Sequence, residues 1–551
     1  MIRRLFNFHG GVHLRQHKTA TLAKPIKDAE LPQQLVLPLQ QHIGHAAEPV
    51  VKVGDYVYRN QLIARAVSGI SAPVHAPSSG KVIALEPRPV PHPSGLQAPC
   101  IVIETDGKDQ DQPQSIEPLK VEDLSPQQLR DQIHAAGIVG LGGAGFPSSI
   151  KLDPDEKVVD LLIINGAECE PYITCDEMLI REHTEEIVQG LMIMRKALQA
   201  QHCIIAVENK KAKALLYLEA VLEEMSLDFV ELVSVPTVYP AGGEKQLVQV
   251  ITGKEVPSQG LPLDINIVCH NVGTAYAVAR AIHHNEPLTS RIITVTGSVA
   301  KSRNLRVRFG TPIAELIQQC GGNCKTLSKV IIGGPMMGMA VHDINAPVIK
   351  TSNCILAISL INDVPLPSRL DQSLPCIRCG FCAEACPMNL LPQQLYWYAK
   401  SKDFDKVQDY NLFDCIECGC CDYACPSHIP LVHYYRYAKT EIWKQEREQQ
   451  KSDISRQRHE FRNLRLELEK QEKAARHKRK QQAISGNTTE DKKKAAIQAA
   501  MERVKAKREQ SLVHAKNTEN LSEEQQRLIA EVDKRRSNPA SGKPKPPEQD
   551  T

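Results

Sequence analysis

Eight cysteines in the last third of the chain occur in two runs with the same spacing. The runs are Cys376-Ile-Arg-Cys379-Gly-Phe-Cys382-Ala-Glu-Ala-Cys386-Pro387 and Cys415-Ile-Glu-Cys418-Gly-Cys-Cys421-Asp-Tyr-Ala-Cys425-Pro426. In the pattern C-x₂-C-x₂-C-x₃-C-P, three thiolates of one loop bind one [4Fe–4S] cluster, and the fourth binds a second cluster. We therefore expect one cluster on Cys376, Cys379, Cys382 and Cys425. We expect the other on Cys415, Cys418, Cys421 and Cys386.

A pair of zinc sites is the alternative for these cysteines. Zinc takes four ligands at the corners of one tetrahedron, usually from two C-x₂-C pairs that lie well apart. Two short runs of four cysteines, each followed by a proline, favour clusters instead. Since such clusters exchange single electrons, the sequence predicts an electron-transfer protein.

A glycine-rich segment could bind an organic cofactor. It runs from Gly140 through Gly142, Gly143 and Gly145 and is followed by Lys151. Glycines let backbone N–H groups approach a phosphate or the edge of a flavin, and a lysine adds positive charge. No strand is expected directly before it, so it is not a Rossmann fingerprint. A tight turn packed on a helix is an equally good interpretation.

Two further loops carry acids. Asn165-Gly-Ala-Glu168-Cys-Glu170 directly follows an expected strand, and Tyr239-Pro-Ala-Gly242-Gly-Glu244-Lys245 forms the third loop. Ligands of open α/β sheets bind at the carboxyl ends of strands, so acids there could accept hydrogen bonds from a ribose or a carboxamide. The alternative is that these acids are ordinary surface charges.

The elements that position these residues predict a multidomain α/β plus β protein. We expect an N-terminal extension with a barrel-sandwich domain over 1–117 and a flavin- and nucleotide-binding α/β domain over 118–255. A β-grasp-like domain is expected over 256–365 and a helical two-cluster ferredoxin domain over 366–440. Residues 441–551 are rich in charge and low in complexity, which predicts a solvated helix or a disordered tail.

Individual elements follow from the sequence pattern. In the α/β domain we expect helices over 124–136, with Ser125 as the cap, 182–198 and 212–225, and strands over 158–164 and 203–207. In the next domain we expect strands over 291–296 and 305–308, and a helix over 311–320 opened by Thr311 and Pro312. Residues 35–105 resemble biotinyl and lipoyl carrier domains, but His75 stands where those domains carry a modified lysine.

Composition excludes several classes of protein. The 17 cysteines would suggest disulfides, but eight belong to the two runs and most others stand singly in apolar stretches, as in a reducing compartment. A transmembrane stretch and a secretory signal are not expected, so we predict a cytoplasmic protein that could still dock on a membrane partner. A net charge of +3 is too small to indicate nucleic-acid binding.

Taken together, the three loops resemble those of the NADH- and FMN-binding subunit of respiratory complex I. Residues 1–440 resemble more closely the C subunits of Rnf ion-translocating oxidoreductases, called Rsx in some bacteria. The matching segments, besides the two cysteine runs, are 142–147, 165–173 and 333–338. The resemblance implies that the glycine loop and Lys151 bind FMN, and that Glu168, Glu170 and Glu244 line the flavin and the nicotinamide. Asn165 and Gly242 belong to the same loops.

The resemblance also implies a function and partners. From the resemblance we expect a peripheral subunit on the cytoplasmic face of the bacterial inner membrane. That subunit works with the other subunits of a membrane-bound Rnf or Rsx complex that pumps ions, and exchanges electrons between NADH and ferredoxin or another acceptor. Chemistry supports a flavin independently, because NADH gives up two electrons at once whereas a cluster takes one.

Three alternatives stay open. One is a soluble flavin and iron–sulfur reductase, such as the cobalamin reductase of bacterial microcompartments. The second is a diaphorase subunit of a hydrogenase or formate dehydrogenase. The third is a non-catalytic electron-transfer scaffold. This chain departs from the complex I subunit in its second cysteine run and in Cys169, which stands between the two acids.

Overall fold

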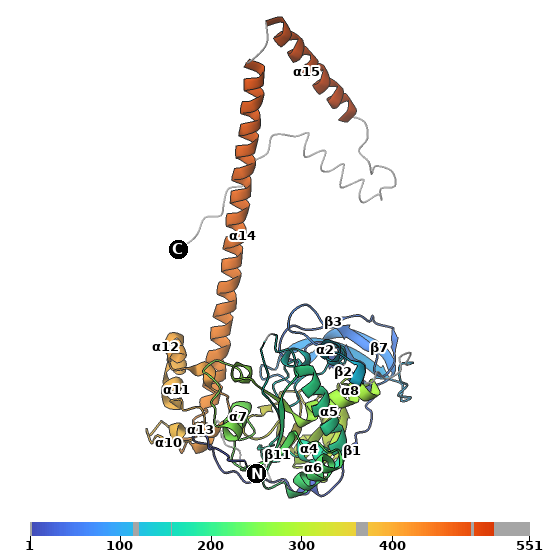
Figure 1. Ribbon diagram of the computed structural model, residues 1–551, viewed down its shortest axis with the longest axis vertical. Coiled ribbons are helices and arrows are strands. Elements are labelled where there is room, and N and C mark those ends of the chain that lie inside the picture. Colours follow the sequence, from blue (N-terminus) through green and yellow to red (C-terminus); the bar gives the residue numbers. More distant parts are fainter. Residues whose placement is uncertain (1–2, 114–120, 156, 360–372, 486–489, 512–551) are drawn as a thin grey trace. The chain divides into compact units, whose positions relative to one another are not determined.

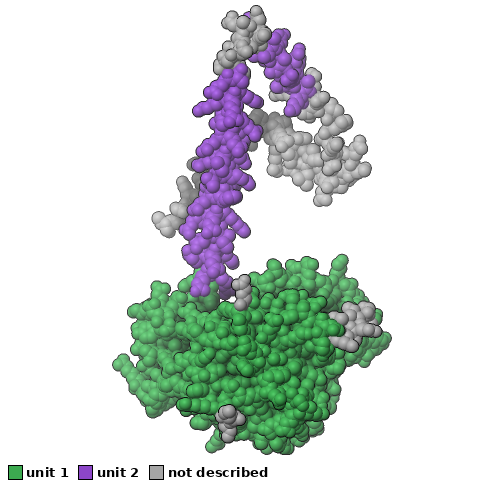
Figure 2. Space-filling view, viewed as in Figure 1, with its two compact units in different colours: residues 1–445 green, residues 446–551 purple. Residues whose placement is uncertain are grey.

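The computed structural model describes residues 3–113, 121–155, 157–359, 373–485 and 490–511. The chain divides into two compact units, residues 1–445 and 446–551 (Figures 1 and 2). The expected domain boundaries at 117 and 365, and the segment 512–551, lie outside the described residues. Among the helices that the structure describes, none is long and apolar enough to cross a membrane.

The N-terminal domain of the first unit consists of two small antiparallel sheets. One has the order β2-β8-β7-β4, and the other has the order β3-β5-β6. The strands are β2 (Gln34–Pro38), β3 (Glu48–Pro49), β4 (Tyr56–Val57), β5 (Leu62–Arg65), β6 (Val74–His75), β7 (Gly80–Pro89) and β8 (Gln97–Thr105). Buried aliphatic side chains of both sheets, such as Leu35, Ile63 and Val82, form part of one core. The expected β domain is confirmed.

The second domain is built on a parallel four-stranded sheet. Its order is β11-β10-β9-β12, and every neighbouring pair is parallel. The strands are β9 (Leu161–Gly166), β10 (His202–Glu208), β11 (Val230–Val235) and β12 (Ile267–Asn271). The central strand begins at Leu161, not at Val158, because the Val158 side chain is exposed outside the sheet. Since β12 supplies the fourth strand, the sheet extends past the boundary expected at residue 255.

Helices surround this sheet. They are α2 (Pro126–Ala135), α3 (Ser148–Lys151), α4 (Cys175–Glu182), α5 (Thr184–Leu198), α6 (Ala212–Glu224), α7 (Glu244–Thr252) and α8 (Val272–His284). Ser125 caps α2 as expected, and Gln128 completes a capping box. The helix expected over 182–198 corresponds to α5 and began two residues too early, whereas α4 was not predicted. Because β9 and β12 are parallel, Asn165 and Asn271 lie side by side at the carboxyl ends of their strands.

The third domain contains a mixed six-stranded sheet of order β1-β14-β13-β17-β15-β16. Its strands are β1 (Lys27–Asp28), β13 (Ser290–Gly297), β14 (Arg303–Arg308), β15 (Leu327–Ile332), β16 (Met339–Ala340) and β17 (Cys354–Ser359). Helix α9 (Ile313–Gln319) covers part of it. We expect Thr311 as the N-cap and Pro312 as the first helical residue. In the structure Pro312 is itself the N-cap, with extended backbone, and the helix begins one residue later. The N-terminal segment joins this sheet through β1.

The cysteine-rich domain is helical. It contains α10 (Phe381–Glu384), α11 (Pro392–Ser401), α12 (Phe404–Asp409), α13 (Cys420–Ala424) and the start of α14 (Leu431–Ser485). Leu395, Val407 and Tyr435 form its apolar core. The helical character expected for this domain is therefore confirmed.

The second unit contains the rest of α14 and α15 (Glu490–Ser511). Almost all described side chains of this unit are exposed. The described part of the charged segment is thus a solvated helix, one of the two expected forms.

Candidate functional site

The eight cysteines of the two runs surround two cavities. The first cavity is lined by Cys376, Cys379, Cys382 and Cys425. The second is lined by Cys386, Cys415, Cys418 and Cys421. We call these sets the Cys376 quartet and the Cys415 quartet. Each quartet contains three cysteines of one run and the fourth cysteine of the other, which is the grouping that the spacing predicts.

The two ligand loops share a backbone conformation. Arg378 and Glu417 each have φ of 57°. Their amide N–H groups each donate to the first sulfur of their own run, Cys376 Sγ and Cys415 Sγ, over 3.4 Å. Amide donors close to cluster sulfur raise the reduction potential of such sites. The cysteine spacing alone did not identify these two residues.

The quartets fit clusters better than single zinc ions. All eight cysteines are free of disulfides. Four sulfurs on one zinc ion lie about 3.8 Å apart, since Zn–S is about 2.3 Å and the geometry is tetrahedral. In the described chain, the four sulfur atoms of neither quartet all lie within 4.8 Å of one another, so they are more widely spaced than the ligands of one zinc ion. Burial raises the pKa of the Cys415 thiol to about 12, so its thiolate form needs a cation beside it, which either metal would supply.

The two quartets differ in their surroundings. Cys379 of the first is exposed, whereas Cys418 and Cys421 of the second are buried. The Tyr239 hydroxyl donates to the backbone carbonyl of Cys418 over 2.6 Å. This tyrosine belongs to the third loop of the α/β domain, so the Cys415 quartet lies directly against that loop.

The glycine loop offers unused donors. Gly140 N–H bonds the Phe146 carbonyl at 2.8 Å and closes the loop. Gly142, Gly143 and Ala144 are exposed between these ends. Their amide N–H groups have no acceptor among the described residues. A Cβ on Gly143 would meet nothing within 4 Å, and one on Gly142 would approach Asn271. The loop therefore has free donors and open space, as a phosphate-bearing cofactor requires.

Lys151 and Glu244 are brought together from separate helices. Lys151 ends α3 and Glu244 begins α7. Lys151 Nζ lies 2.5 Å from Glu244 Oε1, and both side chains are partly exposed. The lysine can therefore reach an anion near the glycine loop only by loosening this ion pair.

Asn165 joins the second loop to the third. Its Nδ2 donates to the Gly242 carbonyl over 2.9 Å, and its Oδ1 accepts from the Ala167 amide over 2.9 Å. A Cβ on Gly242 would lie 2.1 Å from the Ala167 oxygen, so glycine is required at this crossing. The two loops therefore form one rigid rim at the carboxyl edge of the sheet.

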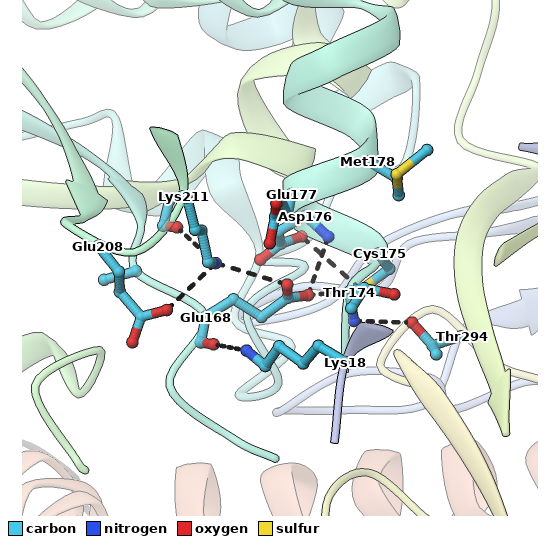
Figure 3. Close-up of polar contacts among 12 residues, drawn as sticks. Lys18, Glu168, Thr174, Cys175, Asp176, Glu177, Met178, Glu208, Lys211 and Thr294 are labelled. Carbon is cyan, nitrogen blue, oxygen red and sulfur yellow. Dashed lines mark hydrogen bonds and ion pairs between the residues drawn. The ribbon is translucent and has the colours of Figure 1, made fainter. Parts of the chain in front are cut away.

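Glu168 lies in a buried ion network (Figure 3). Its Oε1 accepts from the Asp176 amide over 2.9 Å, and its Oε2 lies 3.6 Å from Lys211 Nζ. Lys211 Nζ also lies 3.5 Å from Glu208, and Lys18 of the N-terminal segment donates to the Glu168 carbonyl. The Glu168 side chain is 5% exposed. These contacts hold the carboxylate beneath the loop surface.

Glu170 fastens its loop to the glycine segment 333–338. Its carboxylate accepts from the amides of Met336, at 3.2 Å, and Met337, at 2.7 Å. Burial raises the pKa of Glu170 to about 7. A Cβ on Gly334 would lie 2.1 Å from Glu170 Oε2, so this glycine makes room for the carboxylate. Glu170 therefore holds two loops together, a role that sequence reasoning did not assign.

Asn271 is a site residue that sequence reasoning missed. Its Oδ1 caps α8 by accepting from the Gly273 amide, and its Nδ2 donates to Asp176 Oδ2 over 2.7 Å. The available signal was an asparagine that directly follows an apolar strand and precedes a helical segment. Through Asn271 the glycine loop meets the N-terminus of α8.

Family models match four segments of the first unit. They are the RnfC barrel sandwich hybrid domain over 6–108, the Nuo51 FMN-binding domain over 133–280, the SLBB domain over 292–340 and the 4Fe-4S dicluster domain over 375–429. The chain is thus a multidomain protein with the expected domain types in the expected order.

Curated relatives match most of the chain. The C subunit of an ion-translocating oxidoreductase complex from Vibrio cholerae is 44% identical and aligns over 92% of this chain and 65% of its own length. The corresponding protein of Pectobacterium atrosepticum is 43% identical over 92% of this chain and 71% of its own. The corresponding protein of Haemophilus influenzae is 40% identical and aligns over 92% of this chain and 75% of its own length. The chain thus spans about two thirds of the Vibrio cholerae protein's length.

A solved NAD⁺-reducing [NiFe]-hydrogenase in the H₂-reduced state also aligns with the chain. The TM-score is 0.44 and the identity 18%, over 58% of this chain and 63% of that one. This similarity is too low to establish a shared overall fold. The sequence identity with the curated relatives and the match to the RnfC domain show that the chain belongs to the family of C subunits of ion-translocating oxidoreductase complexes.

Proposed function

We propose that this chain is an NADH-linked electron-transfer subunit of an ion-translocating oxidoreductase complex. It would use FMN at the glycine loop and two [4Fe–4S] clusters on the two quartets. The observation that carries the proposal is the contact between the two sites: Tyr239, in the loop beside the glycine loop, is hydrogen-bonded to Cys418. Cys169 of the second loop, Tyr239 of the third loop and Cys418 belong to one buried cluster of side chains, so these two loops pack directly on the Cys415 quartet.

The roles of the chain's own residues follow from their contacts. The free amides of Gly142, Gly143 and Ala144 would hold the phosphate of the cofactor, and Lys151 would add a charge. Asn165 and Gly242 keep the rim rigid, and Glu170 holds the 333–338 segment beside it. When bound, FMN would accept a hydride from NADH and the clusters would carry single electrons.

The partners are proposed from the family. Its curated members are named as subunits of an ion-translocating complex. We propose that this chain binds other subunits of a membrane-bound complex at the cytoplasmic face of the inner membrane, with ferredoxin or another one-electron carrier as acceptor. The second unit, with its charged solvated helices, is not needed for the quartets or for the glycine loop.

An anaerobic titration tests the proposal. The purified chain is reconstituted with iron, sulfide and FMN, and NADH is added while flavin absorbance and cluster EPR signals are recorded. We expect flavin bleaching followed by a reduced-cluster signal. Clusters that dithionite reduces but NADH does not, in the isolated chain and also in membranes that contain the whole complex, would favour the non-catalytic scaffold.

A further inference from the structure

A third cavity, of about 360 Å³, lies where the three domains of the first unit other than the cysteine-rich one meet. Its lining includes Asn60 of the barrel, Leu141 of the glycine loop, and residues of α4, α8, β13 and β14. Five arginines contribute to it: Arg59, Arg280, Arg291, Arg306 and Arg308. Ligand pockets in proteins begin at about 300 Å³, so the cavity can hold a small molecule.

Arg291 is the exceptional residue of this lining. It is 7% exposed, and its Nη atoms donate to the backbone carbonyls of Lys350 and Leu141. Its Nε has no hydrogen-bond partner. Among the described residues, Asp176 and Glu168 act on its charge, but neither forms a close ion pair with it. The neighbouring Cys175 is a neutral thiol, since burial raises its pKa well above the ordinary value. A buried guanidinium without an anion is costly.

Arg306 is the second cation that lacks a firm anionic partner. Its Nη2 contacts His183 Nε2 over 3.0 Å, and its Nε lies 3.5 Å from Asp28, whose side chain is 86% exposed. Such an exposed pair contributes little. Arg291 and Arg306 are therefore the two arginines of the lining that lack a close ion pair with a buried acid.

The other charged groups of the lining are already neutralised. Arg59 and Arg308 share Asp109, and Arg59 also binds Asp111. Arg280 pairs with Glu286 over 2.7 Å. Asp176 faces Asn271, and burial together with Glu168 raises its pKa to about 6. Asp176 acts on the charge of Arg291 but forms no close ion pair with an arginine among the described residues, so Arg291 and Arg306 keep the capacity to bind a ligand anion.

The rest of the wall is apolar. Tyr276, Ala277 and Leu288 contribute to it, together with Leu179 and Ile292. A ligand that suits both parts has an anionic group and a flat or compact apolar body. Arginines favour phosphate because the guanidinium fork matches its oxygens.

We propose that this cavity binds a nucleotide-type phosphorylated ligand, with its phosphate on Arg291 and Arg306 and its base against Tyr276 and Leu288. The site is separate from the proposed flavin site. Leu141 lines the cavity, whereas the free amides, Lys151 and Glu244 do not. The proposal therefore does not depend on the proposed electron-transfer function.

Calorimetric titration of the full, cluster-reconstituted chain with ADP tests the proposal. We expect saturable binding that Arg306→Gln weakens at least tenfold. Arg291→Gln is less suitable, because the loss of two carbonyl contacts would also disturb folding. Arg65→Gln is the matched control, since Arg65 forms an exposed pair with Glu48 away from the cavity. We expect it to bind ADP like the unmodified chain.

Further titrations test which part of ADP is recognised and at which of the two sites it binds. Inorganic phosphate alone should bind more weakly than ADP, because it leaves the apolar wall uncovered. Lys151→Gln should leave ADP binding unchanged. The proposal is overturned by absence of ADP binding at millimolar concentration, by equal affinity of Arg306→Gln and the unmodified chain, or by loss of binding in Lys151→Gln alone.

Discussion

Tyr239 and Cys418 are joined by a hydrogen bond of 2.6 Å, although they stand 179 positions apart in the sequence. The tyrosine is 2% exposed and the cysteine 7% exposed. The bond fastens the third loop of the α/β domain to the ligand loop of the Cys415 quartet. No other hydrogen bond to a quartet cysteine backbone within the described chain comes from that loop.

Tyr239→Phe should loosen this junction. The substitution removes the hydroxyl and leaves the buried Cys418 carbonyl without its donor, which costs about 1–3 kcal/mol. We expect a lower melting temperature and an altered EPR signal of the Cys415 quartet's cluster, with the signal of the other cluster unchanged. Tyr217→Phe, at an exposed tyrosine of α6, is the control and should change neither. Equal melting curves for the two variants would contradict the structural role of this bond.

Cys379→Ala should remove one cluster. Because Cys379 belongs to the Cys376 quartet only, we expect iron and sulfide content to fall by about half and the folded yield to decrease. Cys420→Ala is the matched control, since Cys420 is buried in the other run but lines neither cavity. It should keep both clusters. Retention of full iron content by Cys379→Ala would refute the assignment of the quartets.

Lys151→Gln should weaken FMN binding. The variant loses the cation that we propose for the cofactor's phosphate, and a charge-assisted hydrogen bond contributes about 1.5–3 kcal/mol, which corresponds to roughly ten- to hundredfold in affinity. Fluorescence quenching of FMN measures the dissociation constant. Lys157→Gln removes a similar ion pair, the one with Asp264, and should leave FMN affinity unchanged. If both variants bind FMN alike, the glycine loop is not the flavin site.

Glu170→Gln should change how stability depends on pH. Burial raises the pKa of Glu170 from 4.5 to about 7. The folded protein therefore binds more protons than the unfolded chain between these values, and stability falls as pH rises through this window. We expect unfolding free energy to decrease from about pH 5 to about pH 8 by on the order of 2 kcal/mol more in the unmodified chain than in the variant. Parallel pH profiles would show that Glu170 does not titrate there.

The same variant addresses the acid loop. Glutamine keeps the shape of Glu170 but weakens its bonds to the Met336 and Met337 amides. We expect slower NADH oxidation with both clusters retained, as EPR and iron analysis would show. Unchanged NADH kinetics would remove Glu170 from the proposed site.

Local chemistry in the sequence was sufficient for several features. The spacing of the cysteine runs predicted which cysteines share a cavity, because three ligands in one loop and a fourth from the other run leave few possible arrangements. The alternation of helices and apolar strands predicted the parallel sheet. Ser125 predicted the start of α2, because capping depends on neighbours only three residues away.

Tertiary structure decided how the loops meet. Glu168 and Glu170 stand two positions apart, yet one lies in an ion network with Lys18 and Lys211 and the other binds the amides of the 333–338 segment. The sequence could not distinguish them, since their partners lie up to 167 positions away in the chain. The Arg291 Nε that lacks a hydrogen-bond partner likewise follows from the packing of β13 against the glycine loop, and no local sequence pattern predicted it. Long-range packing, not residue type, determines which hydrogen-bond and ion-pair partners each acid or arginine has.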